Sequence, residues 1–129
     1  MRTQPLFSLV VGLAAVGCTH APRATWTLDD PDLMRDVITW HVPPGTSIPA
    51  ATAFMKSEGF SVDLRRDATF NERRSWMNVL KTHNQIDFLD CRRVQSAGSL
   101  LMSRFWRVAL RLDGDVVSEV MVSHYVDGP

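Results

Sequence analysis

The chain of 129 residues lacks the sequence signals of most enzyme and nucleic-acid-binding classes. Its four histidines are scattered, and none lies in the Cys/His spacing typical of zinc sites. It has no Gly-x-Ser-x-Gly elbow, no phosphate-binding glycine loop and no dinucleotide fingerprint. Its formal net charge is zero, which argues against a protein that binds nucleic acid. We therefore expect no catalysis, no metal and no cofactor.

Cysteine is also scarce, with only Cys18 and Cys91 in the chain. If Cys18 is modified, Cys91 is a single thiol and no disulfide can form within the chain. We expect Cys91 to be a small buried apolar residue on a strand. The alternatives are an intermolecular disulfide or a reactive thiol, whose thiolate the charges of Arg92 and Arg93 would favour. A reactive thiol would make the protein a small enzyme or a redox-active protein.

No apolar run reaches the roughly 20 residues that a membrane-spanning helix needs. The run over residues 6–16 follows Arg2 and has the length of a signal-peptide core. It ends in the small-residue sequence Ala15-Val16-Gly17-Cys18. Here the chain resembles bacterial lipoproteins, whose signal peptides end in a small-residue box before a cysteine. In that family the cysteine becomes the first mature residue and carries the lipid.

This resemblance implies export and a membrane anchor through lipid at Cys18. Thr19 stands where an Asp would suggest retention in the inner membrane, so the expected location is the outer membrane, facing the periplasm. The chain then divides into a signal peptide (1–17), a lipidated cysteine with its tether (18–25) and one small domain (26–129). The alternative is an ordinary signal peptide cut near Ala-x-Gly, which would leave a secreted protein with a plain thiol.

Two helices are expected in the first half of the domain. Asp29-Asp30-Pro31 predicts a helix start, with a carboxylate cap followed by proline in the first turn. A second helix should be capped by Thr46 or Ser47 and end at Gly59, which favours the left-handed conformation. One apolar stripe of the second helix is formed by Ile48, Ala51, Phe54 and Met55. After Gly59, residues 60–64 alternate as a half-buried strand does.

Residues 67–84 have the least regular pattern in the domain. Asn71 could cap a helix that runs through Leu80, and a long irregular segment with one or two helical turns fits equally well. Alternating apolar and polar residues predict a strand over residues 85–92. Residues 96–99 are typical of a turn.

The last third of the chain has the clearest strand pattern. Apolar residues alternate with more polar ones from Phe105 to Leu112, and Asp113-Gly114 predicts a tight hairpin. A two-residue turn would put on the face of Trp106 the residues Val117, Glu119 and Met121. A three-residue loop would put there Val116, Ser118, Val120 and Val122. We favour the second register because it buries a more apolar set.

These elements predict an α+β fold, with one or two helices packed on one face of a small three- to four-stranded, mainly antiparallel sheet that ends in a β-hairpin. The Gly45-Thr46-Ser47 helix start and the Gly59-to-Val62 helix end are similar to the PASTA module, which binds peptidoglycan. The lipid anchor with helices before an antiparallel hairpin is similar to BamE-like outer-membrane lipoproteins. Both resemblances imply a small envelope domain, and neither carries a functional residue over to this chain.

Basic residues are concentrated in the middle of the domain. Arg107 and Arg111 alternate with apolar residues and should point away from the core, where Arg92 or Arg93 could join them from the neighbouring strand. Such a face could bind anionic lipid headgroups, phosphate-rich glycans or an acidic partner, or be only a solvated surface.

The expected function is therefore that of a non-catalytic, lipid-anchored envelope protein that binds a partner protein or a cell-wall component such as peptidoglycan. The other alternative is a purely structural envelope domain.

Overall fold

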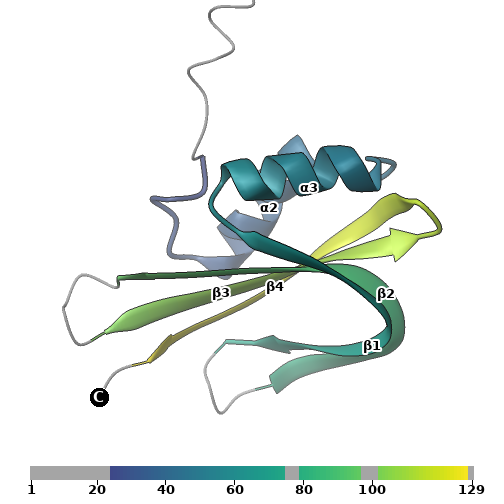
Figure 1. The fold of residues 1–129 in the computed structure, drawn as a ribbon. Coiled ribbons are helices and arrows are strands. Elements are labelled where there is room, and N and C mark those ends of the chain that lie inside the picture. The colour runs from purple at the N-terminus through teal and green to yellow at the C-terminus, as the bar shows by residue number, and fades with distance from the viewer. Residues whose placement is uncertain (1–23, 75–78, 97–101, 128–129) are drawn as a thin grey trace, which may run out of the picture.

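The computed structural model describes residues 24–74, 79–96 and 102–127, which form two helices and four strands. The elements are helix α2 (Pro31–His41), helix α3 (Ile48–Ser57), and strands β1 (Ser61–Arg73), β2 (Val79–Ser96), β3 (Ser103–Asp113) and β4 (Val116–Asp127). The strands form one antiparallel sheet in the order β1-β2-β3-β4, and both helices pack on one face of it (Figure 1). The predicted α+β fold is confirmed.

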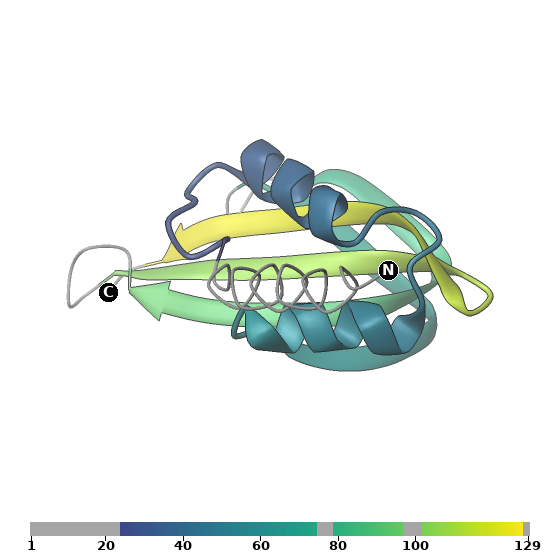
Figure 2. The same ribbon diagram turned by 90° about the horizontal axis from the view of Figure 1, so that it is seen from above.

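Local sequence signals set the ends of both helices. The Asp30 carboxylate accepts the Asp32 N–H at 3.0 Å, and the Ser47 hydroxyl accepts the Ala50 N–H at 3.3 Å. Gly59 follows α3 with a φ of 84°, in the left-handed region that favours glycine. These predicted caps and the predicted left-handed glycine are confirmed. Seen from above, α2 lies over β4, whereas α3 lies toward β1 (Figure 2).

The main core lies between the helices and the sheet. The fully buried side chains of the helices come from Met34 and Ile38 of α2 and from Ala51 and Met55 of α3. They pack against apolar residues of the sheet that include Leu89, Cys91, Trp106, Val108 and Leu110. Phe54, which we placed on the same stripe as Met55, is only partly buried at the margin of this core.

The β1–β2 hairpin bends sharply because each of its strands contains a bulge. Arg66 and Asp67 of β1 lie opposite the single residue Asp87, and farther along Thr69 lies opposite both Asn84 and Gln85. Asp67 and Gln85 have positive φ angles of 49° and 53°. The Asp87 carboxylate stabilises the first bulge by accepting the Asp67 N–H at 2.9 Å. The far half of the hairpin therefore turns under the sheet, on the side opposite the helices (Figure 1).

This bend creates a second core under the sheet, formed by Phe70, Ile86, Phe88, Ala109 and Met121. The end of β1 reaches β4, where the Arg73 N–H donates to the Ser123 hydroxyl at 2.8 Å. Arg74 then pairs with Asp32 of α2 at 2.8 Å. The helical and irregular interpretations of residues 67–84 were both wrong, because the described part of this stretch extends β1 and begins β2. Of the predicted turn, Ser96 ends β2, and residues 97–99 lie outside the described residues.

The β3–β4 hairpin combines features of both predicted registers. Asp113 pairs with Val116 across a two-residue turn, so the favoured three-residue loop was wrong. Ser118 then forms a bulge opposite the Arg111–Leu112 step and shifts β4 by one residue. As a result, the apolar residues that face the main core are Val117, Val120 and Val122. Val116 and Ser118 do not face this core, whereas Val120 and Val122 were placed correctly.

The core assignment predicts different costs for neighbouring residues of α3. Met55→Ala should reduce the free energy of unfolding by about 2–5 kcal/mol, because it removes a fully buried side chain. Phe54→Ala should cost less, and Lys56→Ala, at an exposed position, about 0.5 kcal/mol or less. Urea unfolding of the three variants checks this order. A larger loss for Phe54→Ala than for Met55→Ala would contradict it.

Candidate functional site: an arginine cleft on the outer face of the sheet

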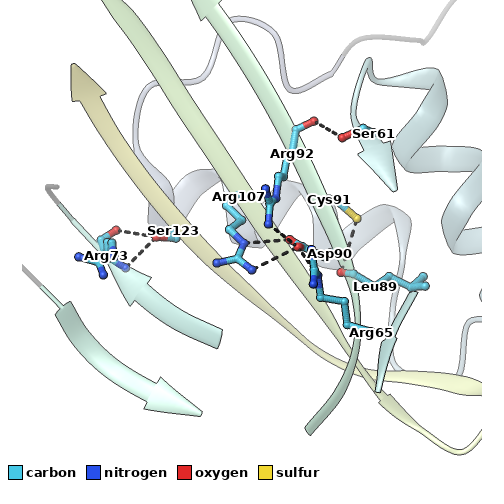
Figure 3. A network of polar contacts seen from close by, with 9 residues as sticks. All are labelled: Ser61, Arg65, Arg73, Leu89, Asp90, Cys91, Arg92, Arg107 and Ser123. Atoms are coloured by element: carbon cyan, nitrogen blue, oxygen red, sulfur yellow. Dashed lines mark hydrogen bonds and ion pairs between the residues drawn. The ribbon is translucent and has the colours of Figure 1, made fainter. Parts of the chain in front are cut away.

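Asp90, in the middle of β2, is a fully buried carboxylate on the sheet face opposite the helices. Arg65 of β1 and Arg92 of β2 each donate to its Oδ2 at 2.9 Å. Arg107 of β3 binds both oxygens, with Nε at 2.9 Å from Oδ1 and Nη2 at 3.2 Å from Oδ2 (Figure 3). Such charge-assisted bonds are among the stronger hydrogen bonds in proteins. One carboxylate thus links three strands.

The arginines determine the charge state of Asp90. Burial alone would raise the pKa of this carboxyl, but hydrogen bonds from Arg107, Arg92 and Arg65 outweigh burial and lower the pKa below its ordinary value. Asp90 is therefore ionised at neutral pH. In return its oxygens restrict the directions in which the three guanidinium groups can point. Arginines on an open surface lack this restriction.

A cleft of about 380 Å³ opens beside this cluster. It is lined by Arg92, Arg93, Val94, Phe105, Trp106, Arg107 and Tyr125. The side chains of Arg93 and Trp106 belong to the helix side of the sheet, so these two residues contribute main-chain atoms. The other five side chains lie on the outer face, and we call the space that they line the arginine cleft.

The arginine cleft has two chemically different walls. Phe105 and Tyr125 are cross-strand partners whose rings stack with centroids 4.9 Å apart, and Val94 beside them is 60 % exposed. These three side chains form an apolar wall. Arg92 and Arg107 form a cationic wall, with side chains 52 % and 31 % exposed. Each wall therefore remains accessible to a ligand, although Asp90 holds both arginines in place.

The charge around the arginine cleft is positive but modest. Arg92 and Arg107, the two outer-face arginines that line it, both donate to the carboxylate of Asp90. The difference leaves one net positive charge. The guanidinium of Arg107 also lies 5.1 Å from the ring of Phe70, so the second core supports this side chain from below.

Arg93 does not belong to the exposed basic face, and its prediction as an anion-binding residue was wrong. It is buried on the helix side, where it donates to the Thr25 hydroxyl at 2.7 Å and to the Glu58 carbonyl at 2.8 Å. Its guanidinium also lies over the rings of Trp26 and Phe60, at 4.3 and 4.5 Å. Burial lowers the pKa of Arg93 to about 10, although the negative charge of Glu58 acts to raise it. Arg93 therefore stays protonated at neutral pH.

Two other predicted site residues, Arg111 and Cys18, are not part of the arginine cleft as the structure describes it. Arg111 points outward as expected, but it pairs with Glu119 at 3.3 Å near the end of the hairpin. Cys18 lies outside the described residues. Of the predicted set, the structure brings together Arg92 and Arg107. It adds Arg65, which sequence reasoning missed because the pattern gave no register between β1 and β2.

Cys91 follows Asp90 in β2 but faces the main core. It is fully buried, as expected for a small apolar residue on a strand, and this prediction is confirmed. Burial and the negative charges of Asp90 and Asp63 raise the pKa of the thiol, so the geometry does not support a reactive cysteine. In the described part of the chain, no three His, Cys, Asp or Glu side chains come together as metal ligands.

No family model, curated protein or solved structure matches this chain. Among residues 24–74, 79–96 and 102–127, no helix has the length and apolar character needed to cross a membrane.

The lowered pKa of Asp90 predicts a loss of stability in acid. A group with a depressed folded-state pKa stabilises the protein above its unfolded pKa, and this contribution disappears as the pH falls through the folded value. Asp90→Asn should therefore be less stable than wild type at pH 7, by about 2–3 kcal/mol because the arginines left behind are partly exposed. The difference should shrink below about pH 4.

Urea unfolding across this pH range measures the effect. Glu119→Gln provides the control, because its carboxylate pairs with Arg111 at an exposed position and should contribute little at any pH. A gap between wild type and Asp90→Asn that stays constant down to the lowest pH would contradict the assignment.

Proposed function

We propose that this protein is a lipid-anchored domain of the bacterial envelope that holds an acidic cell-wall component in the arginine cleft and catalyses no reaction. The observation that carries the proposal is the fixing of Arg92 and Arg107 by Asp90 beside an exposed aromatic wall. Holding a side chain in place before binding lowers the entropic cost of ordering it when the ligand binds. A solvated surface whose only role is solubility has no need of such an arrangement.

The envelope location rests on the leader and on the short distance between Cys18 and the domain. Thr25 is held by Arg93 and by the buried Glu58 carboxylate, which accepts both its N–H and its hydroxyl at 2.8 Å. The segment from Cys18 to Thr25 can span no more than about 25 Å when fully extended. A lipid on Cys18 would therefore keep the domain next to the outer membrane, within reach of the periplasmic wall.

The size of the arginine cleft favours a wall component over a folded partner protein. A volume of about 380 Å³ lies near the lower end of the range for small-ligand sites, roughly 300–1,000 Å³. A stable protein–protein interface buries about 800 Å² on each partner, much more than the cleft walls offer. A short charged section of a wall polymer is the better match.

Two measurements test the proposal. Metabolic labelling with a clickable fatty acid should mark the wild-type chain, and Cys18→Ser should abolish the label. The chain purified in mild detergent should also sediment with isolated cell walls. Arg92→Gln should weaken this retention, because it removes a cationic group from the arginine cleft with little effect on the core, whereas Arg111→Gln should not.

Equal labelling of wild type and Cys18→Ser would refute the anchor. Equal retention of wild type and Arg92→Gln on the walls would mean that the arginine cleft is not the surface that binds them.

A further inference from the structure

We infer that the ligand class of the arginine cleft is an acidic saccharide: a sugar ring against the aromatic wall, with its carboxylate on the cationic wall. This inference rests on the proposed function and adds the chemistry by which the wall component is recognised. We commit to one source, a cell-wall glycan whose sugar carries a free carboxylate.

The aromatic wall is suited to a sugar ring. Phe105 and Tyr125 stack with an interplanar angle of 14°, so each ring covers one face of the other, and their outer faces and edges form an apolar surface that both cores leave uncovered. The C–H face of a sugar is flat and apolar, and aromatic side chains with a polar tip are suited to surfaces that are apolar at one end and wet at the other. Within the described chain the Tyr125 hydroxyl has no hydrogen-bond partner, so it can serve a sugar hydroxyl.

The cationic wall is suited to a carboxylate. Arg92 uses Nη2 on Asp90, and Arg107 uses Nε and Nη2, so other N–H groups of both guanidiniums remain for a ligand. Planar guanidinium groups match a carboxylate in geometry as well as in charge. Both walls border the same cleft, so one small molecule can contact them together.

The net charge distinguishes a single carboxylate from a polyanion. Asp90 offsets one of the two arginines on the cationic wall, which leaves one positive charge for the ligand. A polymer with closely spaced phosphates would bring further negative charges near the Asp90 carboxylate, and like charges in close contact disfavour binding. One carboxylate on a sugar is complementary to the arginine cleft in number as well as in shape.

The test is isothermal titration of the full chain in mild detergent with matched probes. The acidic probe is the disaccharide of N-acetylglucosamine and N-acetylmuramic acid with its carboxylate free, and the neutral probe is the disaccharide of N-acetylglucosamine alone. The acidic probe should bind at least about tenfold more tightly, and added salt should reduce this difference. Arg92→Gln should lower the affinity for the acidic probe to that for the neutral one.

The aromatic wall has its own variants and control. Tyr125→Ala should weaken the binding of both disaccharides. If the alanine variant unfolds, Tyr125→Phe, which keeps the ring and removes the hydroxyl, is measured in its place. Arg111→Gln, on the same face of β3 outside the arginine cleft, and Trp40→Ala, 78 % exposed on the helix side, should bind like wild type. Melting temperatures of all variants establish that each is folded.

Equal affinity for the acidic and neutral disaccharides, or an unchanged Arg92→Gln, would overturn the inference. Tighter binding of a short acidic peptide or a sugar phosphate than of the acidic disaccharide would also overturn it and would identify a different ligand class. If the chain is retained on isolated walls but binds neither disaccharide, the proposed function stands and the saccharide assignment fails.

Discussion

The buried carboxylate of Asp90 is the constraint on which the outer half of this structure depends. A carboxylate without partners at this position would cost several kcal/mol, so the fold has to bring cations to it. Arg65 and Arg107 come from the two strands that flank β2, and they reach Asp90 only if both ladders are in register. The ion cluster therefore selects the pairing of three strands. It also holds in place the arginines that a ligand would meet.

The bend of the β1–β2 hairpin decides which part of the outer face stays open. The bulges at Asp67 and Gln85 turn the far half of the hairpin under the sheet, where Phe70 covers one side of Arg107. The covered half of the face becomes the second core. The other half keeps the Phe105–Tyr125 pair partly exposed, although these rings are large enough to have filled a core. A single bend thus provides both a core and an open cleft.

The sequence predicted features that depend on neighbouring residues and missed those that depend on distant pairing. The Ser47 cap, the left-handed Gly59 and the outward direction of Arg107 follow from short patterns and are present in the structure. Residues 67–84 looked irregular because polar cross-strand pairs, such as Thr69 with Asn84, replace the apolar alternation that indicates a strand. Bulges and the convergence of Arg65 on Asp90 have no local pattern, since they arise from register.

Arg92 and Arg93 show how neighbouring residues of one type acquire opposite roles. Strand alternation sends Arg92 to the arginine cleft and Arg93 to the helix side, where it holds Thr25. Thr25, through which the proposed tether would join the domain, and the proposed binding face therefore lie on opposite sides of β2. A force on Thr25 from such a tether would act on the helix side of β2. A ligand in the arginine cleft would remain on the outer face. The charge pattern of the sequence does not distinguish the two arginines. Their different roles follow only from the alternation of side chains along a defined strand.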